Sequence, residues 1–242
     1  MGHQTETTLL QTVSGYWDQR AEGYSMDVQE QLAGETGENW LGTVEQLAPA
    51  ADYPRVLDIG CGPGFFEALL GSHGYQVTGI DCSEGMLRQA RQNIASVQAN
   101  AAVGIGDAVS PDFKEESFDL IVSRNLLWNL EYPAEAYENW SKLLRPGGRL
   151  ILMDGNYYLH YNDPAYAPHS SGSDHKHMEG IDVSVIDRVA LDLPLSRHRR
   201  PEWDFTQLKA LGMEPSLVRV WKNPAANGGE VVYKFILTAV KE

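Results

Sequence analysis

The chain has 242 residues, 43% of them apolar, and a formal net charge of −14 from 19 basic and 33 acidic side chains. This length suits one α/β domain that carries a sizeable insertion. An acidic chain repels nucleic acid and anionic membrane unless its basic residues cluster, so we expect neither as a partner. One basic cluster exists, at residues 197–200, and it is either a solvated loop or a clamp for an anionic group.

No apolar run approaches the length that spans a bilayer, and the N-terminus shows no secretory signal. The chain has two cysteines, Cys61 and Cys82, which is the usage of a reduced protein. We therefore expect a cytoplasmic protein.

The first 50 residues predict helices. Apolar side chains recur at helical spacing from Leu9 to Trp17, and a second helical pattern runs from Trp40 to Leu47. Gly34 and Gly37 mark a break between the two.

The stretch from residue 55 to residue 66 predicts a strand, a tight turn and a helix. An apolar run ends at Ile59, three glycines (Gly60, Gly62 and Gly64) follow, and a helical pattern begins. This order is typical of a nucleotide-binding loop, because glycine lets the backbone approach a ligand closely. Asp81 ends the next apolar run, where an acid accepts hydrogen bonds from ribose hydroxyls. The pattern predicts an adenosine-containing cofactor.

From residue 54 onward strands and helices alternate, which predicts a parallel sheet. Strands are expected near residues 55–59, 76–80, 101–105, 118–123, 148–153, 214–221 and 231–240. Helices are expected at residues 65–70, 84–94, 133–144 and 203–211. The expected fold is a doubly wound α/β fold, with a seven-stranded, mostly parallel sheet, an antiparallel last strand and helices on both faces.

The run Asp58-Ile-Gly-Cys-Gly-Pro-Gly64 resembles motif I of class I S-adenosylmethionine-dependent methyltransferases, in which an acid stands inside the first strand. Residues 81–86, 106–108, 117–123 and 143–152 resemble the later motifs of that family, in the family's order. The resemblance is close over residues 53–154 and looser over residues 203–242, where only the strand pattern matches. It implies S-adenosylmethionine as the cofactor and a small molecule as the methyl acceptor.

Four segments follow from the resemblance: an N-terminal helical lid (1–50), a cofactor-binding core (51–154), a substrate-cover insertion (155–202) and the last part of the core sheet (203–242). Asp107 is expected to face the adenine amine, with Cys82 and Met86 flanking the ring. The full set of expected cofactor residues is Tyr16, Arg20, Tyr24, Asp58, Gly60, Cys61, Gly62, Asp81, Cys82, Met86, Gly106, Asp107, Ala108 and Ser123.

Two other interpretations of the glycine turn exist. A dinucleotide enzyme would need its third glycine where Phe65 stands, which argues against it. A turn without any ligand would lose stability at three glycines with no compensating need. The lid segment also has an alternative, an amphipathic helix whose aromatic side chains pack on the core.

The insertion at residues 155–202 is rich in tyrosine and holds five of the seven histidines. It follows the fifth strand, at the edge of the sheet where ligands bind in open α/β folds. We expect it to cover the substrate, the alternative being a structural cover on the sheet. The candidate substrate contacts are Trp128, Tyr157, Tyr158 and His160.

Methyl transfer asks little of side chains, because the sulfonium donor is already activated. A base is needed only for a protonated acceptor, and the candidates are Asp154 and His160; Asp154 has an alternative role as a hydrogen-bonded turn residue. One set of residues could form a metal site: His160, His169, His175 and His177 with Asp163 and Asp174. We do not expect a bound metal, because histidines in an insertion of this kind are usually exposed loop residues. The alternative to an enzyme is a sensor or regulatory protein that binds S-adenosylmethionine or S-adenosylhomocysteine without transferring methyl.

Overall fold

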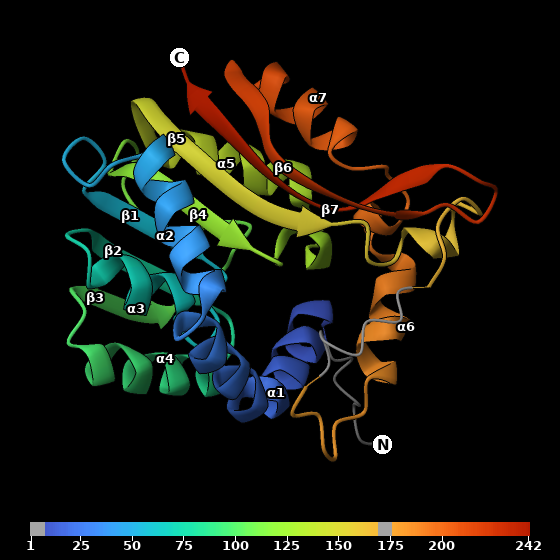
Figure 1. Cartoon of the computed structure of the whole chain (residues 1–242), viewed down its shortest axis with the longest axis horizontal. Helices are drawn as coiled ribbons and strands as arrows, with labels where there is room; N and C mark the ends of the chain where they lie inside the picture. The colour runs from blue at the N-terminus through green and yellow to red at the C-terminus, as the bar shows by residue number, and fades with distance from the viewer. Residues whose placement is uncertain (1–7, 169–175) are drawn as a thin grey trace, which may run out of the picture.

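The computed structural model describes residues 8–168 and 176–242. One seven-stranded sheet, with the strand order β3-β2-β1-β4-β5-β7-β6, lies between helices (Figure 1). The strands are β1 (Arg55–Ile59), β2 (Gln76–Asp81), β3 (Ala101–Ile105), β4 (Phe118–Arg124), β5 (Leu144–Gly155), β6 (Met213–Pro224) and β7 (Glu230–Lys241). The α-helices are α1 (Leu9–Leu32), α2 (Glu35–Leu47), α3 (Phe65–Gly71), α4 (Glu84–Val97), α5 (Pro133–Leu143), α6 (Ser184–Asp192) and α7 (Glu202–Ala210).

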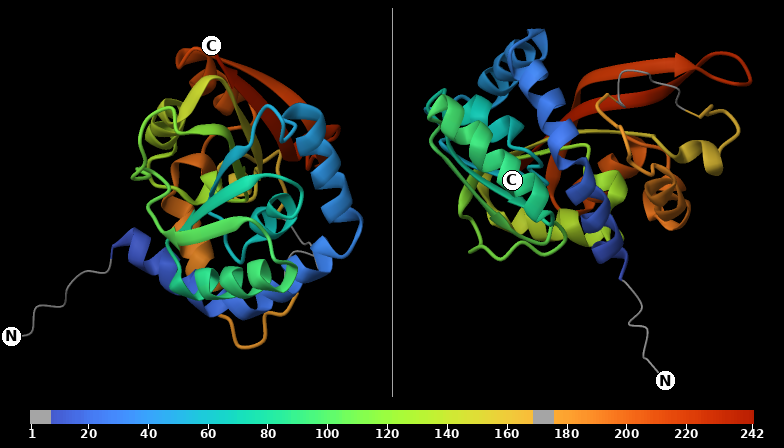
Figure 2. Two further views of the ribbon diagram at one scale, coloured as in Figure 1. Left: turned by 90° about the vertical axis from the view of Figure 1, so that its left-hand side faces the viewer. Right: turned by 90° about the horizontal axis from the view of Figure 1, so that it is seen from below.

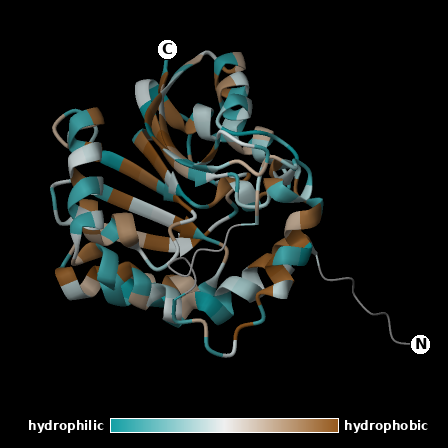
Figure 3. Ribbon diagram, turned by 45° about the vertical axis from the view of Figure 1, so that its right-hand side comes forward, coloured by the Kyte–Doolittle hydropathy of each residue, from teal (hydrophilic) through white to brown (hydrophobic). Residues whose placement is uncertain are grey.

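The first five strands are parallel, and β7 runs antiparallel between β5 and β6. The central strands are covered on both faces, which explains their nearly continuous apolar sequences; the first six residues of β4 are all buried. This arrangement confirms the expected doubly wound fold with one antiparallel strand. Figure 3 shows the hydrophobic colour concentrated on these strands.

Each face of the sheet has its own apolar core. On one face, residues of α2 and α3 such as Trp40, Val44 and Phe66 pack on the strands together with Val28 of α1. On the other face, Tyr137 and Trp140 of α5 and Leu208 of α7 do the same. The helices therefore fix the sheet from both sides and leave the carboxyl ends of β1 to β4 to form loops.

The hairpin of β6 and β7 is longer than the sequence predicts. The pairing continues to Pro224 and Glu230, so the connection shrinks to residues 225–229. Figure 2 shows this hairpin reaching past the other strands. Its end lies above the insertion, where the Ala226 amide donates to the Ala165 carbonyl at 3.0 Å.

The expected N-terminal helices are present. Helix α1 begins at a capping box, in which Thr8 and Gln11 satisfy each other's backbone amides. Its inner end packs on α4, where the Asn93 amide donates to the Ser25 hydroxyl at 3.0 Å and Gln29 donates to Asn93 at 2.8 Å. The lid segment is thus bound to the second helix of the core.

The insertion is not the structureless loop that its composition suggested. It contains α6 and two short 3-10 helices, at Leu159–Tyr161 and Pro194–Ser196. Helix α6 buries Ile186 and Ala190 in a third apolar cluster with Tyr16 of α1 and with Trp128. Figure 1 shows α6 beside the first part of α1.

Candidate functional site

The glycine loop joins β1 to α3, and its conformation requires glycine. Gly60 and Gly64 have φ angles of 74° and 85°. A Cβ on Gly60 would lie 2.8 Å from the Leu126 methyl groups, and one on Gly64 would lie 3.1 Å from Ala90 of α4. Gly60 therefore leaves space for the loop that follows β4, and Gly64 allows α3 and α4 to pack closely.

Asp81 ties the glycine loop to the end of β2. Its carboxylate accepts from the Gly62 amide at 2.9 Å through one oxygen and from the Ser83 amide at 2.9 Å through the other. Burial raises the pKa of Asp81, although these amide hydrogen bonds oppose the rise. The acid predicted for ribose therefore stands at the loop and also holds it in shape.

Two buried acids lie beneath the loop. Asp58 on β1 is 2% exposed and Glu67 on α3 is fully buried. Burial raises the pKa of Asp58 to about 7, with Arg124 opposing. Burial and repulsion from Asp58 raise the pKa of Glu67 well above its usual range. Neither Glu67 oxygen has a hydrogen-bond partner of good geometry among the described residues.

Such a pair of acids in an apolar site favours a cationic ligand, because a positive charge nearby would stabilise their ionised forms. The sequence analysis missed Glu67. Its signal was an acid within the otherwise apolar helix that follows the glycines.

The turn after β3 is the third edge of the site. The Gly106 amide donates to the Asp81 carbonyl at 3.1 Å, which places this turn next to the end of β2. Asp107 is exposed and accepts from the Val109 amide at 2.8 Å, and the Ala108 carbonyl accepts from the Trp140 indole at 2.7 Å. The structure thus brings the predicted ribose and adenine acids to neighbouring turns.

Four predicted cofactor residues support the loops rather than present free polar groups. The Ser123 hydroxyl is buried and donates to the Ile59 carbonyl at 2.8 Å. Met86 is 2% exposed at the start of α4. Burial raises the pKa of the Cys82 thiol to about 12 and that of the Cys61 thiol well above its usual range, so both stay protonated at neutral pH.

Helix α1 lies against the cofactor loops, as the lid hypothesis requires. A Cβ on Gly62 would lie 3.7 Å from the Tyr24 ring, so this ring covers the glycine loop. The Arg20 guanidinium lies 5.8 Å from the centre of that ring and donates to the His177 carbonyl at 3.1 Å. Tyr16 turns instead into the third apolar cluster.

Two polar residues of α1 that the sequence analysis did not select hold the helix in place. The Ser14 hydroxyl donates to the Cys82 carbonyl at 2.9 Å. The Asp18 carboxylate accepts from the Ser83 hydroxyl at 2.6 Å and from the Gly85 amide at 2.8 Å. Asp18 thereby adds a negative charge at the start of α4, where the helix dipole favours one.

The predicted substrate residues gather in one aromatic cluster. The Trp128 ring lies 5.9 Å from the Tyr157 ring and 5.1 Å from the Tyr158 ring, between centroids. The Tyr157 hydroxyl donates to the Asn125 side chain at 2.6 Å. Helix α6 and Tyr16 complete the cluster, so the insertion and the lid meet over the loop that follows β4.

Asp154 does not suit the role of general base. It is fully buried and forms an ion pair with the equally buried Arg200 at 2.8 Å. Its carboxylate also accepts from the amides of Trp128 at 3.0 Å and Gly155 at 2.8 Å. The structure therefore favours the alternative role of Asp154, that of a hydrogen-bonded turn residue.

The basic cluster at residues 197–200 is not a clamp in this structure. Arg200 pairs with Asp204 as well, at 2.6 Å, and Arg199 pairs with Asp163 at 2.6 Å. The Arg197 side chain is exposed. The ion pairs of Arg199 and Arg200 stabilise the last turn of the insertion.

The two described histidines among the metal-site candidates, His160 and His177, have different neighbours. His160 packs on Tyr161, with ring centroids 4.2 Å apart, and its Nδ1 is buried without a hydrogen-bond partner among the described residues. Asp163 is committed to Arg199. His177 lies against α1 instead, and His169, Asp174 and His175 fall outside the described residues.

The fold is Rossmann-like, and the glycine loop, Asp81 and the turn at Gly106 lie at the carboxyl ends of β1 to β3, where ligands bind in open α/β folds. Residues 57–152 match the family described as a methyltransferase domain. Over 102 residues, 42% of this chain, it is 34% identical to a ubiquinone biosynthesis O-methyltransferase of Coxiella burnetii, and the match spans only 44% of that relative's length. Residues 57–152 are thus similar to a methyltransferase domain, and the chain spans less than half the length of this relative.

Two longer matches extend beyond this domain. The O-methyltransferase resE of Aspergillus sclerotiorum is 27% identical over 214 residues, 83% of this chain and 77% of the relative. The structure of magnesium protoporphyrin IX methyltransferase from Synechocystis PCC 6803, with bound S-adenosylhomocysteine, covers 97% of this chain and 100% of its own, with a TM-score of 0.61 at 19% identity. The second likeness shows a common fold.

Proposed function

We propose that this protein transfers a methyl group from S-adenosylmethionine to a small-molecule acceptor. The observation that carries the proposal is the glycine loop, built over two buried acids and closed by Tyr24 of the lid. The loop fits a cofactor whose amino acid end carries an ammonium group, because the Glu67 oxygens have no hydrogen-bond partner among the described residues and Arg124 only partly offsets the burial of Asp58. Asp81 would accept from the ribose hydroxyls and Asp107 from the adenine amine.

When bound, the cofactor supplies an activated methyl group on a sulfonium centre. The protein's task is to hold the acceptor atom in line with the methyl carbon and to exclude water. The cluster of Trp128, Tyr157 and Tyr158 is suited to both tasks, since its rings are packed and partly fixed by hydrogen bonds.

The proposed acceptor carries a hydroxyl on a largely apolar, ring-containing skeleton. The aromatic cluster suits such a skeleton, and the two curated relatives described above are named as O-methyltransferases. A hydroxyl must lose its proton during transfer. His160 is the remaining candidate base, and its buried Nδ1 without a partner among the described residues supports that role.

We place the protein in the cytoplasm, without nucleic acid or membrane as a partner. Its two cysteines are both free thiols. None of the described helices combines the length and the apolar character that a membrane crossing needs.

The test incubates the purified chain with methyl-labelled S-adenosylmethionine and a panel of hydroxylated ring compounds. Calorimetry with S-adenosylmethionine and S-adenosylhomocysteine runs in parallel. Label transfer to a panel member supports the proposal. Tight cofactor binding without transfer to any member, or to a metabolite extract, would favour the sensor alternative, and absence of binding would refute both.

A further inference from the structure

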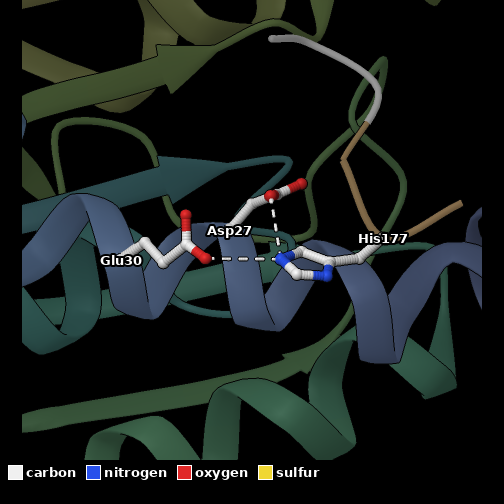
Figure 4. Close-up of side chains that lie close together, drawn as sticks. All are labelled: Asp27, Glu30 and His177. Carbon is white, nitrogen blue, oxygen red and sulfur yellow. Dashed lines mark hydrogen bonds and ion pairs between the residues drawn. The ribbon is translucent and has the colours of Figure 1, made fainter. Parts of the chain in front are cut away.

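A cluster of one imidazole and two carboxylates joins the insertion to the lid helix, away from the glycine loop. Asp27 and Glu30 lie one turn apart on α1, and His177 comes from residues 176–183, which we call the strap (Figure 4). The His177 Nε2 atom lies 3.3 Å from a Glu30 oxygen and 3.9 Å from an Asp27 oxygen. All three side chains point toward one common position.

We propose that Asp27, Glu30 and His177 bind one divalent transition-metal ion of the Zn²⁺ or Mn²⁺ class, which fastens the strap to α1. This proposal does not depend on the proposed methyl transfer.

The spacing of the three ligand atoms suits such an ion. One ligand atom from each residue lies within 4.8 Å of the other two. Ligands about 2.0–2.1 Å from a tetrahedral ion stand roughly 3.3–3.4 Å from one another. The two separations from the imidazole nitrogen, 3.3 and 3.9 Å, are close to this spacing, and the two carboxylate oxygens lie within 4.8 Å of each other.

Asp27 gives a second and independent reason. Its side chain is 10% exposed, and the only cationic atom within 4.0 Å among the described residues is the imidazole nitrogen at 3.9 Å. It accepts no hydrogen bond of good geometry from any residue that the structure describes. A buried carboxylate is stabilised in its ionised form by hydrogen bonds or a counter-charge, so a cation at the position that Asp27 faces would stabilise it.

The strap is also shaped to present its imidazole there. A Cβ on Gly23 would lie 2.1 Å from the His177 carbonyl oxygen, so glycine alone lets the strap cross α1 at this point. Arg20 donates to the same carbonyl at 3.1 Å. The backbone of His177 is thereby held against the helix, which limits the orientations of its ring.

The ligand chemistry selects the class of ion. An imidazole nitrogen with two carboxylate oxygens suits Zn²⁺ or Mn²⁺ better than Mg²⁺ or Ca²⁺, which prefer oxygen alone. One competing cation is present, because the Lys176 ammonium lies 2.8 Å from the second oxygen of Glu30. That pair leaves the oxygen nearest His177 for the ion.

The experiment uses the full chain after dialysis against a chelator. Zn²⁺ and Mn²⁺ are titrated separately by calorimetry, and bound metal is counted by mass spectrometry. We expect one ion per chain, with affinity reduced at least tenfold by His177→Gln and by Asp27→Asn. The matched control is His73→Gln, an exposed histidine of another region, which should leave the affinity unchanged. Circular dichroism in chelator checks that each variant is folded.

A fourth variant separates a metal site from a simple ion pair. Lys176→Gln removes the competing cation, so a metal site should bind its ion more tightly. Hydrogen exchange should show metal-dependent protection of residues 176–183 in the wild type and not in His177→Gln. The proposal is overturned if the wild type binds neither metal, or if His177→Gln binds it as tightly as the wild type.

Discussion

Asp58 is the residue whose charge state matters most to the cofactor loop. Because burial raises its pKa to about 7, the side chain is mainly protonated below that pH and mainly ionised above it. Under the proposed function, the ionised form would attract the ammonium group at the amino acid end of S-adenosylmethionine. Cofactor affinity should therefore rise as the pH increases through about 7, as measured by calorimetry between pH 5.5 and 8.5.

The variant Asp58→Asn should flatten this pH profile and weaken binding by about 1.5–3 kcal/mol, the range for a hydrogen bond to a charged group. The ligand-free protein should show the opposite trend in stability. Folded Asp58 keeps its proton to a higher pH than the unfolded chain, so its favourable contribution is lost as the pH rises from about 4 to about 7. An affinity that is constant over this range would contradict the assignment.

Asp81→Ala should weaken cofactor binding by about 1.5–3 kcal/mol, because its carboxylate is expected to accept from both ribose hydroxyls. The structure adds a second effect. The Gly62 and Ser83 amides lose their acceptor, so the melting temperature of the ligand-free protein should also fall. Asp107→Asn is the comparison, since that exposed side chain should lower affinity while leaving the melting temperature unchanged. Unaltered affinity in a folded Asp81→Ala protein would remove it from the site.

The glycines and Asp81 were predictable from sequence because they lie within one strand-helix-strand unit, residues 55–81. Three other residues were not predictable, because their surroundings arise from segments far apart in the chain: Ser14, Asp18 and Glu67. The same reason applies to the cluster of Asp27, Glu30 and His177, because two of its members lie on α1 and the third lies 147 residues after Glu30 in the chain.

At the level of the elements, α1 is the part of the protein that should respond to the cofactor. In the wild type, cofactor should protect residues 14–30 from hydrogen exchange. Asp18→Ala removes the acceptor for the Ser83 hydroxyl and the Gly85 amide, so exchange in α1 should rise and the protection should weaken. Loss of such a cap costs about 0.5–2 kcal/mol.

The control for this experiment is Glu22→Ala, an exposed acid on the same helix, which should behave as the wild type. Exchange in α1 that is equal with and without cofactor would argue against a lid.

The central strands were predicted well because their buried sequences are almost wholly apolar. Helix α6 was not predicted, although its apolar residues follow helical spacing: Val185, Ile186, Val189 and Ala190. The many tyrosines and histidines in the insertion are typical of a loop and obscured this short helical pattern. The long β6–β7 hairpin was underestimated because most of β6 is exposed and its sequence has no buried stripe.

At the level of the whole molecule, Arg200 is the residue on which the join between insertion and sheet depends. It is fully buried between Asp154 and Asp204. Arg200→Met should destabilise the protein by about 3–5 kcal/mol, since two carboxylates would lose their buried partner. Thermal or denaturant unfolding measures this effect.

The neighbouring residue supplies the control. Arg199 is 63% exposed and pairs with Asp163 at the surface, so Arg199→Met should cost less than about 1 kcal/mol. Equal losses in the two variants would show that the buried ion pair has no special weight. Sequence alone could not separate these adjacent arginines, because only the fold buries one and exposes the other.

The two ends of the insertion are bound to each other as well as to the sheet. Besides the Asp154–Arg200 ion pair, the Asn156 side chain donates to the Arg200 carbonyl at 2.8 Å and accepts from its amide at 3.0 Å. The segment between them is a closed loop, and the free energy of closing a loop changes slowly with its length. A longer, shorter or different segment between these two ends should therefore leave the glycine loop and the sheet unaltered, and under the proposed function it would change the acceptor.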